Sequence, residues 1–306
     1  MNRAFVSFLW VALLTSAVAA QQAASAAGQA HDEAAKASDA AGVQENVPYG
    51  PGLVLDVYQP GEVGGNRPAV VLIHGGGWTS FDKSTMTKMA QFLARSGFVA
   101  FAVDYRLFHE NENRWPAQLD DVQRAVRWVR AHADKYGVNP EKIGAFGHSA
   151  GAQLAALLGM EETRDNSDAT LARYSSRVQA VVDYSGPTDF TTERNPEGMA
   201  FLANFFRGDY STHPEVWRDA SPAFHTAKSN APFLIIHGTH DESVPIAQAQ
   251  EFYDKLKAAG VPVSLTKIDE GHTFQKPESR RQLALESRDF FNQYLGSSAL
   301  TERTIK

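Results

Sequence analysis

The chain has 306 residues, a net charge of −6 and no cysteine. This length is enough for one large domain. The weak negative charge provides neither the basic surface that binds nucleic acid nor a polybasic patch for membrane headgroups. Without cysteine, the chain can form no disulfide and can carry no lipid anchor on a cysteine.

The N-terminus has the pattern of a secretory signal peptide. Arg3 precedes an apolar run at 4–14, and small residues follow at 15–20. The run is too short for a comfortable membrane span. We therefore expect residues 1–20 to be removed after Ala19 or Ala20, with export to the periplasm or medium of a bacterium and no stable membrane anchor. An uncleaved anchor is the alternative.

Residues 21–46 are rich in alanine, glutamine and small polar residues, which predicts a flexible leader. From residue 47 onward, short apolar runs alternate with helical patterns. Most of these runs are apolar on both faces, which is typical of parallel strands covered by helices. Strands are expected at 53–60, 69–74, 98–105, 142–147, 178–184, 232–238 and 263–268, and helices at 84–97, 117–137, 152–158, 247–260 and 279–296.

This alternation predicts an α/β fold with a mostly parallel sheet, in one catalytic domain at 47–296 followed by a tail at 297–306. In the helix at 117–137, apolar residues recur at helical spacing, and Arg124, Arg127 and Arg130 fall on the other side. These arginines predict a solvated face. Residues 185–225 interrupt the alternation of strands and helices, and a long insertion between two strands usually forms part of a functional site.

Ser149 lies at the joint between a predicted strand and a predicted helix, with Gly147 and Gly151 on either side. The Gly-x-Ser-x-Gly pattern alone is weak evidence, but this context agrees with it. A turn this sharp leaves no room for side chains beside the serine. Such a turn would place the serine hydroxyl above the edge of the sheet, close to the backbone amide groups at the N-terminus of the following helix. We predict that Ser149 is a nucleophile.

A serine nucleophile needs a base, and the base needs an acid that orients it. In folds of this kind the chain order is serine, acid, histidine, each after a strand. Asp241 follows the strand at 232–238, and His272 follows the last strand as the only histidine downstream of Asp241. Asp241 and His272 are therefore the predicted acid and base, with Asp269 and Glu242 as the rival carboxylates.

Three consecutive glycines, Gly75, Gly76 and Gly77, follow the strand at 69–74. Acyl transfer passes through a tetrahedral oxyanion, which needs amide donors placed around it. The predicted donors are the amides of Gly76 and Ala150, with Gly75 or Gly77 assisting.

Trp78, His148 and Phe205 are the candidate substrate contacts. Trp78 either lines the pocket or packs beneath the glycine turn, and these two readings stay open. His148, next to the nucleophile, fits a buried hydrogen-bonding residue better than a second base. Phe205 lies in the long insertion, and an aromatic acyl group would stack near Trp78 or Phe205.

The stretches LIHGGGW, IGAFGHSAGAQLAALL, PFLIIHGTHDESVP and EGHTF resemble the α/β-hydrolase superfamily, and within it the hormone-sensitive-lipase-like esterases. The chain is most similar to the bifunctional feruloyl and acetyl xylan esterases, over most of residues 47–296. Ala152 stands where the commonest form of the motif has a glycine. The large helical cap of the lipase-like members is not evident, so residues 185–225 would form at most a small lid.

This resemblance implies a serine carboxylic-ester hydrolase acting on short acyl esters, with acetyl and feruloyl esters of plant polysaccharides as candidate substrates. It implies no metal and no organic cofactor, and a small-molecule or carbohydrate-linked ester as the partner. Aryl formamidases and peptidases share the fold and the triad. A catalytically silent binding module is the alternative from another class, although such proteins usually lose a triad member.

Overall fold

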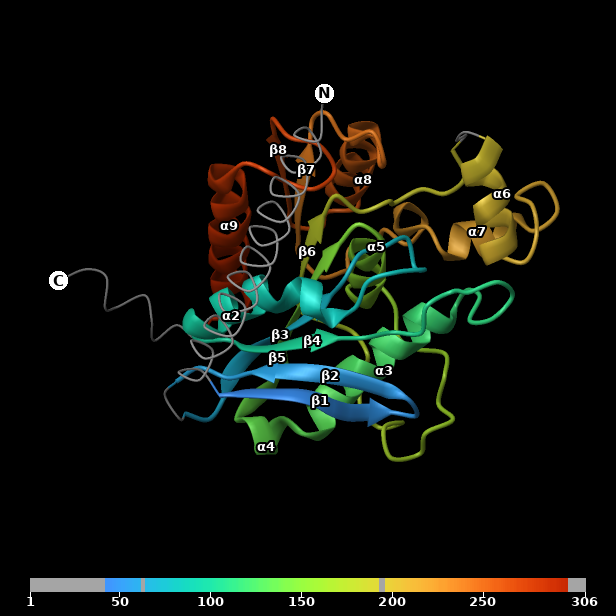
Figure 1. The fold of residues 1–306 in the computed structure, drawn as a ribbon. Helices are drawn as coiled ribbons and strands as arrows, with labels where there is room; N and C mark the ends of the chain where they lie inside the picture. The colour runs from blue at the N-terminus through green and yellow to red at the C-terminus, as the bar shows by residue number, and fades with distance from the viewer. Residues whose placement is uncertain (1–41, 62–63, 193–195, 297–306) are drawn as a thin grey trace, which may run out of the picture.

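Within residues 42–61, 64–192 and 196–296, which the computed structural model describes, eight strands form one central sheet (Figure 1). The strand order is β1-β2-β4-β3-β5-β6-β7-β8. β1 runs antiparallel to β2, β2 runs antiparallel to β4, and all other pairs are parallel. The strands are β1 (Val43–Gly50), β2 (Leu53–Tyr58), β3 (Arg67–Ile73), β4 (Val99–Val103), β5 (Val138–His148), β6 (Ala180–Tyr184), β7 (Phe233–Gly238) and β8 (Val263–Ile268).

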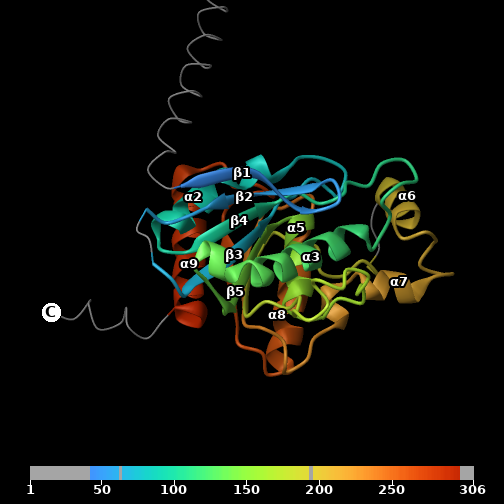
Figure 2. The same ribbon diagram turned by 90° about the horizontal axis from the view of Figure 1, so that it is seen from below.

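Helices cover both faces of the sheet (Figure 2). One apolar core includes side chains of α3, α5 and α8, and the other includes side chains of α2 and α9. The described helices are α2 (Thr87–Arg95), α3 (Ala117–Ala131), α4 (Ala133–Tyr136), α5 (Ala150–Leu158), α6 (Pro196–Phe205), α7 (Pro214–Asp219), α8 (Ile246–Ala258) and α9 (Pro277–Leu295), with short 3-10 turns η2 (Lys83–Met86) and η3 (Pro222–Phe224).

The central strands are apolar on both sides because both sides are buried. In β3, Val71 and Ile73 belong to the core under α3 and α5, whereas Val70 and Leu72 belong to the core under α2 and α9. Alternate residues of a strand point to opposite faces, so a covered parallel strand needs a continuous apolar run. The predicted α/β fold with a mostly parallel sheet is confirmed.

The N-terminal boundary differs from the prediction. Strand β1 begins at Val43, so the last four residues assigned to a flexible leader at 21–46 belong to the sheet. β1 is an edge strand in which only Tyr49 is buried, and its polar sequence gives no apolar alternation. The predicted signal peptide at 1–20, the rest of the leader up to residue 41 and the tail at 297–306 lie outside the described residues.

No helix in the described part of the chain has both the length and the apolar character that crossing a membrane would require.

The expectation of a solvated arginine face on α3 is wrong for two of its three residues. Arg127 and Arg130 are only 4% and 7% exposed. Their guanidinium groups donate to backbone carbonyls of the chain between α5 and β6, which include those of Leu171 and Ser175. The carbonyls of this irregular segment have no ladder partners, and the arginines satisfy them. Arg124 forms an ion pair with Asp168 and stays partly exposed.

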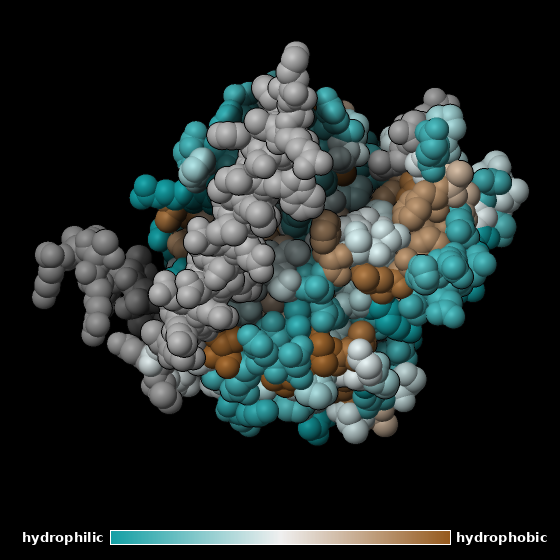
Figure 3. All heavy atoms as spheres, in the orientation of Figure 1, coloured by the Kyte–Doolittle hydropathy of each residue, from teal (hydrophilic) through white to brown (hydrophobic). Residues whose placement is uncertain are grey.

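The insertion between β6 and β7 folds into α6, α7 and η3, beside the main body (Figure 1). An aromatic cluster ties it to the body: Phe205 and Phe206 of the insertion are fully buried, and Phe205 stacks on Trp78 with ring centroids 5.2 Å apart. Apolar side chains gather on the surface over α6 (Figure 3). The insertion thus packs its aromatic side chains inward against Trp78 and Phe108 of the main body.

Candidate active site

Ser149 occupies a strained turn between β5 and α5. Its backbone φ is 54° and its ψ is −122°, a conformation that an L-residue rarely adopts. A Cβ at Gly147 would lie 2.1 Å from the carbonyl oxygen of Gly151, and one at Gly151 would lie 2.2 Å from that of Ile73. Side chains at either position would clash with backbone, so the two glycines permit the turn that exposes the serine.

Three predicted residues meet at this turn, from three different loops. The Oγ of Ser149 lies 2.8 Å from Nε2 of His272, and Nδ1 of His272 lies 2.7 Å from Oδ2 of Asp241. An ionised carboxylate only accepts hydrogen bonds, so Nδ1 carries the proton and Nε2 presents its lone pair to the serine hydroxyl. This is the protonation state that a general base requires.

Asp241 is held as an anion by four donors. Its Oδ1 accepts from the amides of Ser243 and Val244 at 2.9 and 2.8 Å, and its Oδ2 lies 3.1 Å from Nε2 of His237. Burial alone would raise the pKa of Asp241, but the hydrogen bonds from His237, His272 and the Val244 amide hold this pKa well below its usual range.

The rival carboxylates lie elsewhere. The Asp269 side chain is 78% exposed and pairs with Lys276, and Glu242 is exposed. The structure therefore brings Asp241, and neither rival, to His272.

The glycine turn lies against the nucleophile. A Cβ built on Gly75 would sit 3.2 Å from the Cβ of Ser149. The carbonyl of Gly76 accepts from the amides of Thr79 and Ser80, which closes the turn. The amide of Ser149 donates to the carbonyl of Tyr184 at 2.9 Å. Among the backbone hydrogen bonds of the described residues outside helices and strands, none uses the amides of Gly76, Gly77 or Ala150 as donors.

Trp78 packs beneath the turn. It is 6% exposed, and its Nε1 donates to Oε1 of Gln153 at 3.1 Å. Trp78 therefore packs beneath the glycine turn and does not line the pocket.

Phe205 has no exposed surface, because α6 turns its ring inward between Trp78 and Phe108. A fully buried side chain cannot touch a substrate unless α6 moves. The structure therefore does not support Phe205 as a substrate contact.

His148 stacks on Tyr184 with ring centroids 4.3 Å apart, and its Nε2 lies 3.4 Å from the backbone oxygen of His272. Burial, followed by repulsion from His272, lowers the pKa of His148 to about 4. A histidine that stays neutral and contacts the backbone of the triad histidine is a packing and hydrogen-bonding residue here. This agrees with the prediction that it is not a second base.

One residue near the site was not predicted. Phe81 is 65% exposed, has a φ of 68°, and its ring lies over Gly76, where an added Cβ would come within 2.9 Å of Cδ2. The loop is fixed by side-chain bonds: Asp82 caps η2, and Asp104 accepts from the Lys83 amide at 2.7 Å. The sequence around Phe81 carries no periodic pattern that would have shown which aromatic side chain faces the site.

Two other features of the described chain lie apart from the triad. Ligand atoms of Glu161, Asp219 and His225 lie within 4.8 Å of one another. The carboxylates are already paired, Glu161 with His225 at 2.6 Å and Asp219 with Arg164 at 2.7 Å, so the cluster balances its own charge.

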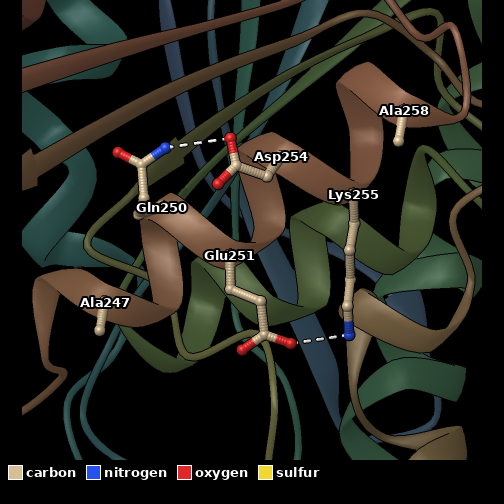
Figure 4. A pocket seen from close by; sticks show the side chains of 6 residues that line it. All are labelled: Ala247, Gln250, Glu251, Asp254, Lys255 and Ala258. Carbon is tan, nitrogen blue, oxygen red and sulfur yellow. Dashed lines mark hydrogen bonds and ion pairs between the residues drawn. The ribbon is translucent and has the colours of Figure 1, made fainter.

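The second feature is an open groove along the outer side of α8, lined by side chains of that one helix (Figure 4). Glu251 and Lys255 form an ion pair within it at 2.7 Å. It contains none of the three residues of the triad.

A serine raised over the edge of a mostly parallel sheet and hydrogen-bonded in turn to a histidine and an aspartate defines the serine hydrolases of the α/β-hydrolase fold. Residues 55–256 match the model of the BD-FAE family. The chain belongs to this family, which lies within the hormone-sensitive-lipase-like α/β hydrolases that the sequence motifs resemble.

Several known proteins similar to the chain are esterases. It is 35% identical over 225 residues to the esterase LipC of Mycobacterium tuberculosis, covering 70% of this chain and 55% of LipC. The chain spans about half the length of LipC and of similar mycobacterial esterases.

Two solved structures have a similar fold. The truncated form of a carbohydrate esterase from gut microbiota superposes with a TM-score of 0.72 at 27% identity, covering 84% of this chain and 97% of that one. The propionate-bound esterase Est2 of Thermogutta terrifontis gives a TM-score of 0.71 at 25% identity, covering 85% and 97%.

Proposed function

We propose that this protein is a serine carboxylic-ester hydrolase that works through an acyl-enzyme. The observation that carries the proposal is the hydrogen-bonded row from Ser149 through His272 to Asp241 on a strained strand–helix turn. Membership of the BD-FAE family and the similarity to named esterases support it.

The chemistry follows from the atoms that face one another. His272 Nε2 takes the proton of Ser149 as the Oγ attacks the ester carbonyl carbon, and Asp241 stabilises the resulting imidazolium. The amides of Gly76 and Ala150, with Gly75 or Gly77 assisting, donate to the oxyanion of the tetrahedral intermediate. His272 then protonates the departing alcohol oxygen. A water molecule repeats the sequence on the acyl-serine and releases the carboxylic acid.

The proposed substrates carry short acyl groups. The aromatic side chains Phe205 and Phe206 of the insertion are buried, and Phe205 packs against Trp78, so the insertion leaves little apolar wall to cover a long chain. Each buried methylene is worth about 0.8 kcal/mol, and only where protein replaces water around it. Phe81, exposed beside the glycine turn, offers an open aromatic surface for a sugar ring or an aromatic group. We propose acetyl and feruloyl esters of plant polysaccharides as candidates.

The experiment that tests this function is a panel of kcat/KM values. It runs p-nitrophenyl esters from acetate to palmitate beside acetylated xylan, methyl ferulate, N-formylkynurenine and a peptide p-nitroanilide. We expect the highest values from acetate to butyrate and a steep fall beyond octanoate. Preference for palmitate would indicate a lipase, preference for N-formylkynurenine or the peptide would indicate a formamidase or peptidase, and no turnover would indicate a binding module.

We also propose that the protein acts outside the cytoplasm. The support is the sequence pattern of residues 1–20, a positive charge followed by a short apolar run and small residues. Mass spectrometry of the protein from its own host tests this proposal. A mature N-terminus at Ala20 or Gln21 in the periplasm or medium is expected, and an intact Met1 in the membrane fraction would contradict it.

A further inference from the structure

His237, at the end of β7, is a second histidine in contact with the triad aspartate. It is fully buried, and its Nε2 lies 3.1 Å from Oδ2 of Asp241 and 2.8 Å from the carbonyl oxygen of Val244. His272 reaches the same Oδ2 at 2.7 Å. One oxygen of Asp241 therefore stands between two imidazole rings, and the mechanism above uses only one of them.

The partners of Nε2 determine the tautomer of His237. A backbone carbonyl and an ionised carboxylate both only accept hydrogen bonds, so Nε2 must carry a proton and donate it. The N–H of His237 is thus shared between Val244 and Asp241. A hydrogen bond to a charged acceptor between two fully buried side chains is stronger than one between neutral groups.

Buried polar atoms lie behind His237. Nδ1 of His237, Oδ2 of Asp183 and Oγ of Ser185 are buried without a hydrogen-bond partner among the described residues. β6 and β7 pair in parallel with Asp183 opposite Ile235, which sets Ser185 opposite His237. Val181 and Ile235, two residues before Asp183 and His237, both face the core under α5 and α8, so these polar side chains share that face of the sheet.

We propose that His237 is a positioning residue for the triad, which donates its Nε2 proton to Asp241 and so reduces the negative charge that Asp241 presents to His272. Asp183 lies on the neighbouring strand, on the same face of the sheet as His237. The inference deepens the proposed esterase mechanism and rests on it. Burial raises the pKa of Asp183 to about 6, so the charge of this carboxyl changes within the pH range in which a histidine base titrates.

The consequence is a shift in the pH at which the base becomes active. Without the donor from His237, Asp241 keeps its place, because the amides of Ser243 and Val244 still hold its Oδ1. Its charge is then less compensated and favours the protonated form of His272 more strongly. When this donor is removed, we expect the acid limb of the kcat/KM profile to move about one pH unit upward. Activity then falls about tenfold below the midpoint and changes little above it.

The experiment compares His237→Leu, which removes the donor, with His237→Gln, whose amide nitrogen can take the place of Nε2. Asp183→Asn is made alone and with His237→Leu, so that titration of Asp183 is removed from the comparison. Two other titratable groups that interact with Asp241 are His148 and Tyr184, and their pKa values, about 4 and about 12, lie outside the pH range in which a histidine base titrates. His132→Leu is the control, since His132 caps α3 through a bond to Trp128.

Two readouts separate this inference from the proposed function. The first is the pH profile of ester turnover. The second is ¹⁵N NMR of the imidazole rings, which follows the titration midpoint of His272 and the tautomer of His237 without any substrate. A wild-type protein that turns over no ester would refute the esterase, while the NMR titration still tests the role of His237.

We expect the midpoint of His272 to rise in His237→Leu in both Asp183 backgrounds and to return toward wild type in His237→Gln. An unchanged midpoint in folded His237→Leu, or the same shift in His237→Gln, would overturn the inference. The wild-type protein provides an independent check if His237→Leu does not fold. There His237 must be protonated at Nε2, and a ring protonated only at Nδ1 would refute the proposed donor.

Discussion

Replacing Asp241 with asparagine tests the electrostatic part of the mechanism. The oxygen of the new amide can still accept from the amides of Ser243 and Val244, which lie 2.9 and 2.8 Å from Oδ1. The NH₂ group must then replace Oδ2, where it faces the Nε2 proton of His237 and the Nδ1 proton of His272. The NH₂ donor of the asparagine would then face two other N–H donors where its side chain is fully buried.

His272 relieves this conflict by moving its proton from Nδ1 to Nε2, which leaves no lone pair to accept the proton of Ser149. We expect kcat to fall about 10⁴-fold, or about 5.5 kcal/mol in activation free energy, with KM nearly unchanged. The lost charge-assisted hydrogen bonds should also lower the free energy of unfolding by about 2 kcal/mol.

The assay is hydrolysis of p-nitrophenyl acetate at saturating substrate, with thermal unfolding measured on the same samples. Asp269→Asn is the matched control, because Asp269 is a neighbouring carboxylate that is 78% exposed and does not contact His272. The reasoning is refuted if Asp241→Asn keeps a tenth of the wild-type kcat, or if Asp269→Asn is the more damaging change.

Three further predictions use other parts of the site. Gly147→Ala should abolish activity, since its Cβ would lie 2.1 Å from a backbone oxygen. The control Gly271→Ala, whose Cβ meets nothing closer than 3.8 Å, should stay near wild type. Equal activities of the two variants would argue against a sterically tight turn. Because the pKa of His148 is lowered to about 4, its contribution to stability is present above pH ~6.5 and lost as pH falls toward 4. His148→Gln should therefore flatten the decline of Tm over that range. A decline parallel to that of the wild type would contradict this. Phe81→Ala should lower kcat/KM for methyl ferulate about fivefold relative to p-nitrophenyl acetate. Phe224→Ala, at the other large exposed apolar side chain of the described residues, should not. Identical effects of the two variants would show that Phe81 does not contact the substrate.

The residues that meet at the triad were predictable because they obey local rules. The turn at Ser149 needs glycine on both sides, and a parallel sheet brings the loops after its strands to one edge. The chain order of acid and histidine then left few choices, and the structure brought together the three residues that were predicted. The central strands could also be predicted from the sequence, since strands covered on both faces must be apolar throughout.

What the sequence did not reveal depends on partners far along the chain. Arg127 and Arg130 look like a solvated helix face until the segment between α5 and β6 folds over them. Phe205 and Phe81 are both aromatic residues near predicted loops, and only the packing of α6 determines that Phe205 is buried while Phe81 is exposed. The first residues of β1 carry no apolar alternation, because an edge strand can form through backbone hydrogen bonds alone.

The central claim is that Ser149 is the nucleophile, and covalent labelling tests it most directly. A fluorophosphonate probe is incubated with the wild-type protein and with Ser149→Ala, and the modified peptide is located by mass spectrometry while ester turnover is followed. We predict one label per chain, on Ser149, with complete loss of turnover, and neither label nor turnover in a Ser149→Ala variant that melts like wild type. Label on another residue, or a tenth of wild-type turnover in Ser149→Ala, would contradict the mechanism.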